Sequence, residues 1–159
     1  MAETRSEQYR PLSDDDADRW SRFGRWEEQV YYPQLLGLEV EEIRYDYCRM
    51  RLPFRPELHQ PAGVVHGGAI ASLIDSVVVP AIGSALPAES RFATIDLQVQ
   101  YLGAVGAEDM VAEGWVVQRG RSIVFCEADV LAGEHGRRVA RGLMTYKVSG
   151  GSADYRGPS

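Results

Sequence analysis

A long stretch with hardly any polar residue constrains this chain more than any other feature. From Gly68 to Ile82 the residues are apolar on every side of a 3.6-residue helical wheel, with Ser72, Asp75 and Ser76 as the only polar exceptions. This pattern predicts a helix that is buried on all sides. A carboxylate left unpaired among apolar groups is costly, so we expect Asp75 to be paired, protonated or used in chemistry.

The tripeptide His66-Gly67-Gly68 predicts how this helix begins. Glycine has no Cβ, so another molecule can approach the backbone closely. The first N–H groups of a helix have no partner within it, and together with the helix dipole they suit a carbonyl oxygen that gains negative charge during attack. The tripeptide is equally well explained as a tight turn that enters a helix, and both interpretations remain open.

A longer pattern around this tripeptide resembles a known protein family. Gln60 stands six positions before His66, Asp75 stands nine positions after it, and the strand-like segment 93–102 carries Thr94-Ile95-Asp96. The pattern is similar to that of the hotdog-fold acyl-CoA thioesterases of the phenylacetate-pathway (PaaI-like) type, and it covers roughly residues 34–148. That family carries Asp or Glu at the acid position and Asn or Gln where Gln60 stands.

The resemblance implies an acyl- or aryl-coenzyme A thioester hydrolase, built on an antiparallel sheet that curls around the long helix. The thioester carbonyl would sit on the Gly67 amide, and His66 would hold the loop or the thioester group. Asp75 would either activate water as a general base or attack directly to form an anhydride. Gln60 would orient water or the carbonyl. Thr94 is a supporting candidate, although the alternation of its strand places it opposite the apolar face.

Helix geometry predicts that each site is shared by two subunits. Asp75 lies eight positions beyond Gly67, which is ~12 Å along a helix that rises ~1.5 Å per residue. A catalytic acid must come within ~3 Å of the reacting water, which itself touches the carbonyl. A two-fold axis can instead bring the Asp75 of one subunit to the Gly67 of the other. The family is similar in placing its sites at such an interface, so we expect a homodimer, with a homotetramer as the larger alternative.

The charge of the chain limits its partners. A net charge of -6 argues against a nucleic-acid binder, whose surface would be basic. Coenzyme A brings several negative charges to this acidic protein, so arginines should gather locally around its phosphates. The best candidates flank the strand-like segment 123–131 and are Arg119, Arg121, Arg137 and Arg138. Coenzyme A is part of the substrate, and we expect no separate cofactor and no metal.

The remaining sequence predicts one domain with two extensions. With 159 residues and 45% hydrophobic content, the chain can bury a core. It lacks both a secretory signal and the run of ~20 apolar residues that spans a membrane. We therefore expect a cytoplasmic location without membrane contact. In residues 1–33 we expect a disordered tail up to residue 12 and then a helix from Ser13 to Tyr32-Pro33. We expect residues 34–149 to form the hotdog domain and residues 150–159 to form a disordered tail.

Six segments alternate as strands do: 38–44, 47–53, 93–101, 110–118, 123–131 and 138–148. Cys48 and Cys126 lie in two of them without metal-ligand spacing, so we expect reduced, structural thiols.

The loop 53–61 should deliver Gln60 to the start of the helix. Helical spacing relates Trp20, Phe23, Trp26 and Val30, and this aromatic stripe either packs on the sheet or covers an acyl pocket.

The sequence is also compatible with two other functions. One is a non-catalytic acyl-CoA-binding protein on the same fold, and the other is a hydratase or dehydratase on the same fold. The arrangement of Gln60, His66 and Asp75 argues against the hydratase, whose histidine and acid are placed differently. An assay of thiol release from a panel of acyl-CoA thioesters would separate the three.

Overall fold

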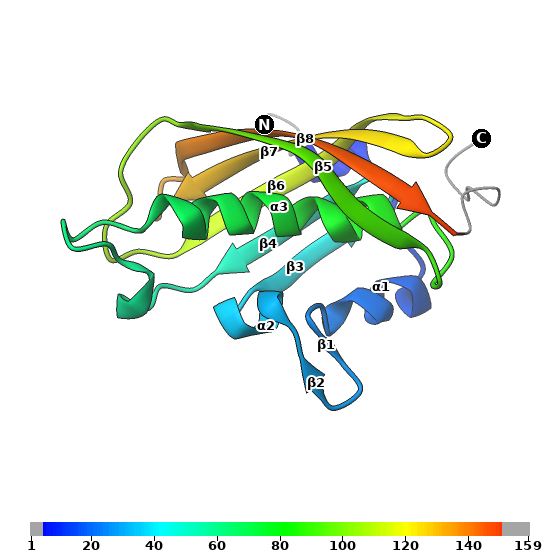
Figure 1. The fold of residues 1–159 in the computed structure, drawn as a ribbon, viewed down its shortest axis with the longest axis horizontal. Helices are drawn as coiled ribbons and strands as arrows, with labels where there is room; N and C mark the ends of the chain where they lie inside the picture. Colours follow the sequence, from blue (N-terminus) through cyan, green and yellow to red (C-terminus); the bar gives the residue numbers. More distant parts are fainter. Residues whose placement is uncertain (1–4, 151–159) are drawn as a thin grey trace.

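The fold is built on a six-stranded antiparallel sheet and a long helix that lies across it (Figure 1). A computed structural model describes residues 5–150. The helix is α3 (Gly67–Gly83), and the sheet has the strand order β3-β4-β6-β7-β8-β5. Its strands are β3 (Glu39–Arg44), β4 (Tyr47–Leu52), β5 (Arg91–Tyr101), β6 (Met110–Arg119), β7 (Ile123–Ala132) and β8 (Arg137–Ser149). This confirms the predicted sheet around one helix, and the six strand predictions are correct to within two residues.

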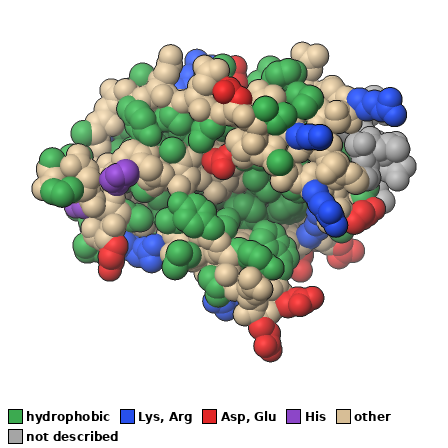
Figure 2. All heavy atoms as spheres, in the orientation of Figure 1, with side chains coloured by type: hydrophobic (Ala, Val, Ile, Leu, Met, Phe, Trp, Pro, Cys, Tyr) green, Lys and Arg blue, Asp and Glu red, His purple; other side chains and the backbone are tan. Residues whose placement is uncertain are grey.

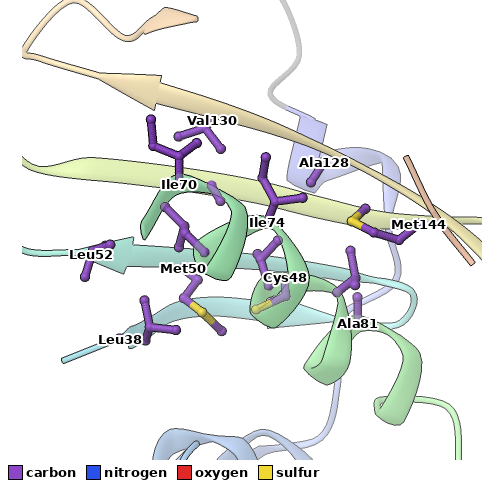
Figure 3. Packing of buried hydrophobic residues seen from close by; sticks show 14 of the residues in the cluster. Leu38, Cys48, Met50, Leu52, Ile70, Ile74, Ala81, Ala128, Val130 and Met144 are labelled. Atoms are coloured by element: carbon purple, nitrogen blue, oxygen red, sulfur yellow. The ribbon is translucent and has the colours of Figure 1, made fainter. Parts of the chain in front are cut away.

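The core fills the space between α3 and the sheet. Leu73, Ile74 and Val77 of α3 are fully buried, and Figure 3 shows Ile74 among side chains that come from several strands. Two strand glycines let the helix approach the sheet closely. A Cβ added to Gly114 of β6 would lie 2.7 Å from Val77 Cγ1, and one added to Gly142 of β8 would overlap Ile74 Cγ2. Close packing of α3 therefore depends on the absence of side chains at these two positions.

The helix α3 is not buried on all sides, which corrects the prediction from its composition. The residues Gly68, Ala71, Ser72, Asp75 and Val79 remain half-buried or exposed in the single chain, and their spacing of three or four places them on one stripe of the helix. We call these five residues the open stripe. Hydrophobic side chains gather across the middle of the face that carries α3, and charged ones lie mainly toward its edges (Figure 2). Apolar composition alone thus overestimated how much of the helix one chain covers.

The predicted N-terminal helix is correct only in its first part. It begins as expected, with Ser13 as the N-cap, but α1 (Asp14–Ser21) ends before Gly24. A small hairpin follows, with β1 (Arg25–Trp26) and β2 (Gln29–Val30), and then a short helix, α2 (Tyr32–Leu36). Gly24 has a φ of +83°, and a Cβ there would lie 2.6 Å from the backbone N of Gln34, so the chain turns back at this glycine. Pro33 stands in the first turn of α2, where proline is favoured, rather than ending a helix.

The segment 5–12 is ordered, contrary to the prediction of a disordered tail. It contains the 3-10 helix η1 (Arg5–Gln8), and the Arg5 guanidinium stacks 3.6 Å from the ring centroid of Trp115. The ring of Tyr9 stacks on Tyr47 with centroids 5.2 Å apart. These contacts lie on strands β4 and β6. Predictions of disorder for residues 1–4 and 151–159 fall outside the described residues.

The two cysteines are free and buried, as expected. Burial raises the pKa of the Cys48 thiol well above its usual range and raises that of Cys126 to about 12. Both thiols therefore stay protonated and unreactive in the folded protein. Within residues 5–150 no helix is long and apolar enough to cross a membrane.

Candidate active site

The start of α3 presents one unpaired backbone donor. His66 is the N-cap residue, and its Nδ1 accepts a 2.8 Å hydrogen bond from the Gly68 N–H. The Ala69 N–H donates to the His66 carbonyl at 2.9 Å. Among residues 5–150, the Gly67 N–H has no hydrogen-bond partner. Gly67 therefore supplies the donor that the helix start can offer to a substrate carbonyl.

The cap also determines what His66 can do. Because Nδ1 accepts the Gly68 N–H, a neutral imidazole must carry its proton on Nε2, which is then a hydrogen-bond donor. The side chain is exposed, so this donor is accessible. A Cβ on Gly68 would lie 2.9 Å from Nδ1 of His66, which explains why the second glycine is needed.

A tyrosine from β5 fixes the first glycine. The Tyr101 hydroxyl donates to the Gly67 carbonyl at 2.8 Å, and a Cβ on Gly67 would lie 3.2 Å from the Tyr101 ring. An open cavity of about 400 Å³ lies beside this contact. It is lined mainly by apolar residues, among them Val65, Ile70, Leu102 and Val105. The helix start thus borders a space that a substrate could enter.

The loop that carries Gln60 is tied to the same helix start. It contains the 3-10 helix η2 (Pro56–Leu58), and the His66 N–H donates to the Leu58 carbonyl at 2.7 Å. The Gln60 side-chain oxygen accepts from the Ala62 N–H at 3.1 Å, so the carboxamide is folded onto its own loop. The structure therefore brings Gln60, His66 and Gly67 to one junction.

Asp75 lies two turns further along the helix and is held by two hydroxyl groups. The Oδ1 atom accepts from Thr94 Oγ1 at 2.9 Å and from the Tyr146 hydroxyl at 2.6 Å. The Tyr146 hydroxyl also lies 2.7 Å from the Asp75 carbonyl oxygen. Within residues 5–150 the Oδ2 atom has no hydrogen-bond partner. The carboxylate is half-buried on the open stripe, so one oxygen is held and the other is available.

Thr94 reaches Asp75 because strand β5 contains a bulge. Thr94 pairs with Tyr146 and Asp96 pairs with Thr145, so Ile95 is an extra residue in the ladder. An extra residue reverses which face of the sheet the following side chains occupy. Thr94 therefore faces α3 together with Leu97 and Val99, which pack against the core, whereas uninterrupted alternation placed it on the opposite face.

A tyrosine of α2 contacts the open stripe one turn before Asp75. The Tyr32 hydroxyl lies 2.7 Å from Ser72 Oγ, and Ser72 Oγ donates to the Gly68 carbonyl at 2.8 Å. Tyr32 is therefore the donor in the first of these contacts. At the other end of α3, a Cβ on Gly83 would overlap the Trp20 ring. The N-terminal segment therefore runs beside α3 from Gly83 back to Ser72.

The four candidate arginines are divided between the two ends of strand β7. Arg119 pairs with Asp46, with Nε 2.8 Å from the carboxylate, and also donates to the Ile82 carbonyl near the end of α3. Arg137 pairs with Glu108 at 2.9 Å and Arg138 with Asp129 at 3.2 Å. Arg121 is exposed in the turn before β7, and no ion pair of Arg121 occurs among the described residues. Arg119 lies opposite Val124 of β7, and Arg138 lies opposite Leu131, seven residues or ~23 Å further along the strand, so one chain cannot gather all four around one phosphate.

Comparisons with known proteins identify the fold of this chain. Residues 62–139, which include His66, Gly67, Asp75 and Thr94, match the Thioesterase superfamily. The PaaI protein of the phenylacetic acid degradation operon of Escherichia coli superposes with a TM-score of 0.68 at 16% identity, over 75% of this chain and 84% of that one. This chain has the hotdog fold of the thioesterase superfamily.

Two relatives by sequence carry activity in their names. A protein of Halobacterium salinarum with a provisional esterase assignment is 39% identical over 101 residues, which cover 60% of this chain and 66% of the relative. The medium/long-chain acyl-CoA thioesterase YigI of Escherichia coli is 25% identical over 132 residues, which cover 74% of this chain and 84% of the relative. Together with the match to the Thioesterase superfamily, these names support thioester hydrolysis in general terms.

Two groups of residues thus stand at separate points of the hotdog helix. Gln60, His66 and Gly67 lie at its start, and Thr94 joins Asp75 further along. Sequence analysis missed Tyr146. The sequence feature that could have identified it is a single hydroxyl group among the inward-facing residues of β8, where its neighbours Met144 and Val148 are apolar. No group of three or more His, Cys, Asp or Glu side chains that could hold a metal ion occurs in the part of the chain that the structure describes.

Proposed function

We propose that this hotdog protein hydrolyses acyl-coenzyme A thioesters in sites shared by two subunits. The observation that carries the proposal is the pair of unused groups on α3: the Gly67 N–H at its start, and the Oδ2 of a carboxylate whose Oδ1 is already bound. The first is an oxyanion donor and the second is a proton acceptor or nucleophile. Hydrolysis of a thioester needs one of each.

Each residue then has a defined task in the reaction. The substrate carbonyl oxygen accepts from the Gly67 N–H, and the Nε2–H of His66 donates to the thioester group. Asp75 of the partner subunit removes a proton from the attacking water, or attacks the carbonyl carbon itself to form an anhydride that water then opens. In both routes the bond between carbon and sulfur breaks, and coenzyme A leaves as the thiolate, which takes up a proton that the consumed water gives up. Gln60 orients the water or the carbonyl.

The dimer is supported by two features of the single chain. Gly67 and Asp75 lie eight residues apart on one continuous helix, ~12 Å along its axis, so they cannot serve one carbonyl together. Strand β5 is an edge strand of eleven residues, and an open edge of this length is a template for pairing with another chain. A two-fold axis that brings Gly67 to Asp75 of the partner subunit passes near Ala71, midway between them. Ala71 lies on the open stripe.

We propose an apolar acyl group for the substrate. Five of the exposed apolar side chains belong to the N-terminal segment that runs beside α3, namely Trp26, Val30, Tyr31, Tyr32 and Leu35. Tyr32 contacts the open stripe through Ser72 and can form a wall for the acyl group close to Asp75. The name of YigI, which specifies medium and long acyl chains, is in keeping with such a wall.

The phosphates of coenzyme A should bind cationic side chains that have no carboxylate partner. Of the four candidate arginines, Arg121 fits best, because the other three have carboxylate partners. Arg119, Arg137 and Arg138 remain proposed contacts that would have to exchange or share those partners. Lys147 lies opposite Ile123 and Ala93 and so occupies the same corner of the sheet as Arg121. We propose that coenzyme A binds at this corner.

Thiol release from a panel of acyl-CoA thioesters tests the function directly. Asp75→Asn preserves volume and the accepting Oδ1 but loses the proton acceptor, so turnover should fall by at least ~10²–10⁴-fold while substrate binding persists. Binding without turnover in the unmodified protein would favour the non-catalytic alternative. Hydration of an enoyl-CoA without thiol release would favour the hydratase. Near-normal turnover by Asp75→Asn would overturn the mechanism.

A further inference from the structure

We infer that Tyr146 is a positioning residue for the reaction, and that together with Thr94 it makes Oδ2 the reacting oxygen of Asp75. The inference rests on the proposed hydrolysis and adds a residue that neither the sequence pattern nor the named relatives point to. Tyr146 is 2% exposed, lies on β8, and does not reach the start of its own α3 helix. It therefore acts on the substrate only through Asp75.

The contacts of Tyr146 restrain the carboxylate in two ways. Its hydroxyl lies within hydrogen-bond distance of both Oδ1 and the backbone carbonyl oxygen of Asp75. One phenolic oxygen thus bridges the side chain and the main chain of the same residue, which fixes the rotation of the carboxylate about its bonds. Thr94 donates to the same Oδ1 from the neighbouring strand. With both donors on Oδ1, the lone pairs of Oδ2 remain for a water proton or a carbonyl carbon.

Tyr146 is suited to be a donor and not an acid or a base. Burial first, and then the negative charge of Asp75, raises the pKa of its hydroxyl well above the usual range. The phenol therefore keeps its proton at neutral and moderately alkaline pH. Its role is to donate a hydrogen bond to a charged acceptor, which is among the stronger kinds of hydrogen bond in proteins.

The bulge at Ile95 is what allows two strands to act on one oxygen. Thr94 and Tyr146 are register partners on β5 and β8, and their side chains face α3 side by side. Without the extra residue, the inward register of Leu97 and Val99 would place Thr94 on the outer face of the sheet. The bulge therefore serves the site while leaving the apolar packing of the rest of the strand intact.

The variant Tyr146→Phe tests this role because it removes one oxygen and keeps the buried ring. We expect kcat to fall about 10- to 100-fold with little change in KM, as for the loss of a hydrogen bond to a charged group. In the Asp75→Asn background the same change should have no further effect on the residual rate, because the carboxylate whose Oδ2 reacts is no longer present. The matched control is Tyr47→Phe. Tyr47 is also fully buried, and its hydroxyl donates to Oε1 of Glu113 at 2.9 Å. Tyr47→Phe should leave kcat unchanged.

A second pair of variants covers the case in which Tyr146→Phe does not fold. Thr94→Ser keeps the hydroxyl and should retain activity, whereas Thr94→Val, of nearly the same shape, should lose it. A fall in kcat for Tyr146→Phe that is equally large in the Asp75→Asn background overturns the inference, and so does equal activity of Thr94→Ser and Thr94→Val. Normal activity of Tyr146→Phe beside an inactive Asp75→Asn overturns it as well but leaves the proposed function standing. Activity of Asp75→Asn itself would remove the proposed function.

Discussion

The Nδ1 atom of His66 accepts the Gly68 N–H at 2.8 Å, so the imidazole closes the start of α3 in the way that asparagine or serine does in other helices. Among residues 5–150, the contact leaves the Gly67 N–H and the His66 Nε2–H without a hydrogen-bond partner, so both can bind a substrate. His66 thus has a structural task and a proposed chemical task, and the two can be separated by substitution.

His66→Asn should keep the cap and lose the Nε2–H donor, whereas His66→Ala should lose both. We expect His66→Ala to lower the free energy of unfolding by about 1 kcal/mol, the usual value of an N-cap, and His66→Asn to leave it nearly unchanged. Both variants should lower kcat/KM for thioester hydrolysis. Urea unfolding and thiol release measure the two effects separately. Full activity of His66→Asn would show that the histidine is only a cap.

Mixing two inactive variants tests the shared site. Asp75→Asn removes the acid, and Gly67→Val blocks the helix start, because the glycine Cβ position is already 3.2 Å from the Tyr101 ring. A mixed dimer regains one intact site, and so up to about half of the wild-type activity per mixed dimer. Differently tagged subunits show whether exchange has occurred. If they exchange and activity does not return, each subunit works alone.

Removing the charge of Arg121 should weaken coenzyme A binding more than it slows the reaction. Arg121→Gln is expected to raise KM by about three- to tenfold with kcat nearly unchanged, since the contact is remote from the reacting atoms. Arg22→Gln, an exposed arginine that follows α1, makes the same change in net charge and should leave KM as it was. An equal rise of KM in both variants would assign the effect to the overall field and not to a phosphate contact.

The wall that we propose for Tyr32 should set the preference for acyl length. Tyr32→Ala removes the ring and should lower kcat/KM for long acyl chains by about tenfold more than for acetyl-CoA, at ~0.8 kcal/mol for each methylene that loses its contact. Tyr32→Phe keeps the ring and loses only the contact with Ser72 Oγ, so the length profile should be preserved. A uniform loss across all chain lengths would place the acyl group elsewhere.

The close approach of α3 to β8 predicts an unusually sensitive glycine. Gly142→Ala would place a Cβ on Ile74 Cγ2, next to Asp75, and should lower the free energy of unfolding by about 1–3 kcal/mol, as overpacking does. Gly106→Ala is the control, since a Cβ there has nothing within 4 Å. Urea unfolding of both variants gives the comparison, and equal stability of the two would mean that the helix can shift without cost.

The elements that sequence predicted well are those whose pattern is local. The six strands alternate over their whole length, and α3 combines an apolar run with a glycine pair behind a capping residue, so propensity and periodicity agree. The N-terminal segment misled because the spacing of Trp20, Phe23 and Trp26 also suits a hairpin that begins at Gly24. There the left-handed backbone of one glycine outweighs the periodicity of the aromatics around it.

The sequence by itself determined the strands and the long apolar helix, because apolar periodicity and glycine position are properties of neighbouring residues. Its resemblance to the hotdog thioesterases named Asp75, Gly67, His66 and Gln60 as candidates. Only the tertiary structure decided which partners these residues have. The bulge at Ile95 turned Thr94 toward the helix, and strand pairing set Tyr146 opposite it, 52 positions away in the chain. The same pairing separated the candidate arginines, and the folding of one chain left a stripe of α3 uncovered. Such contacts join residues that are distant along the chain, and no local pattern encodes a distance between them.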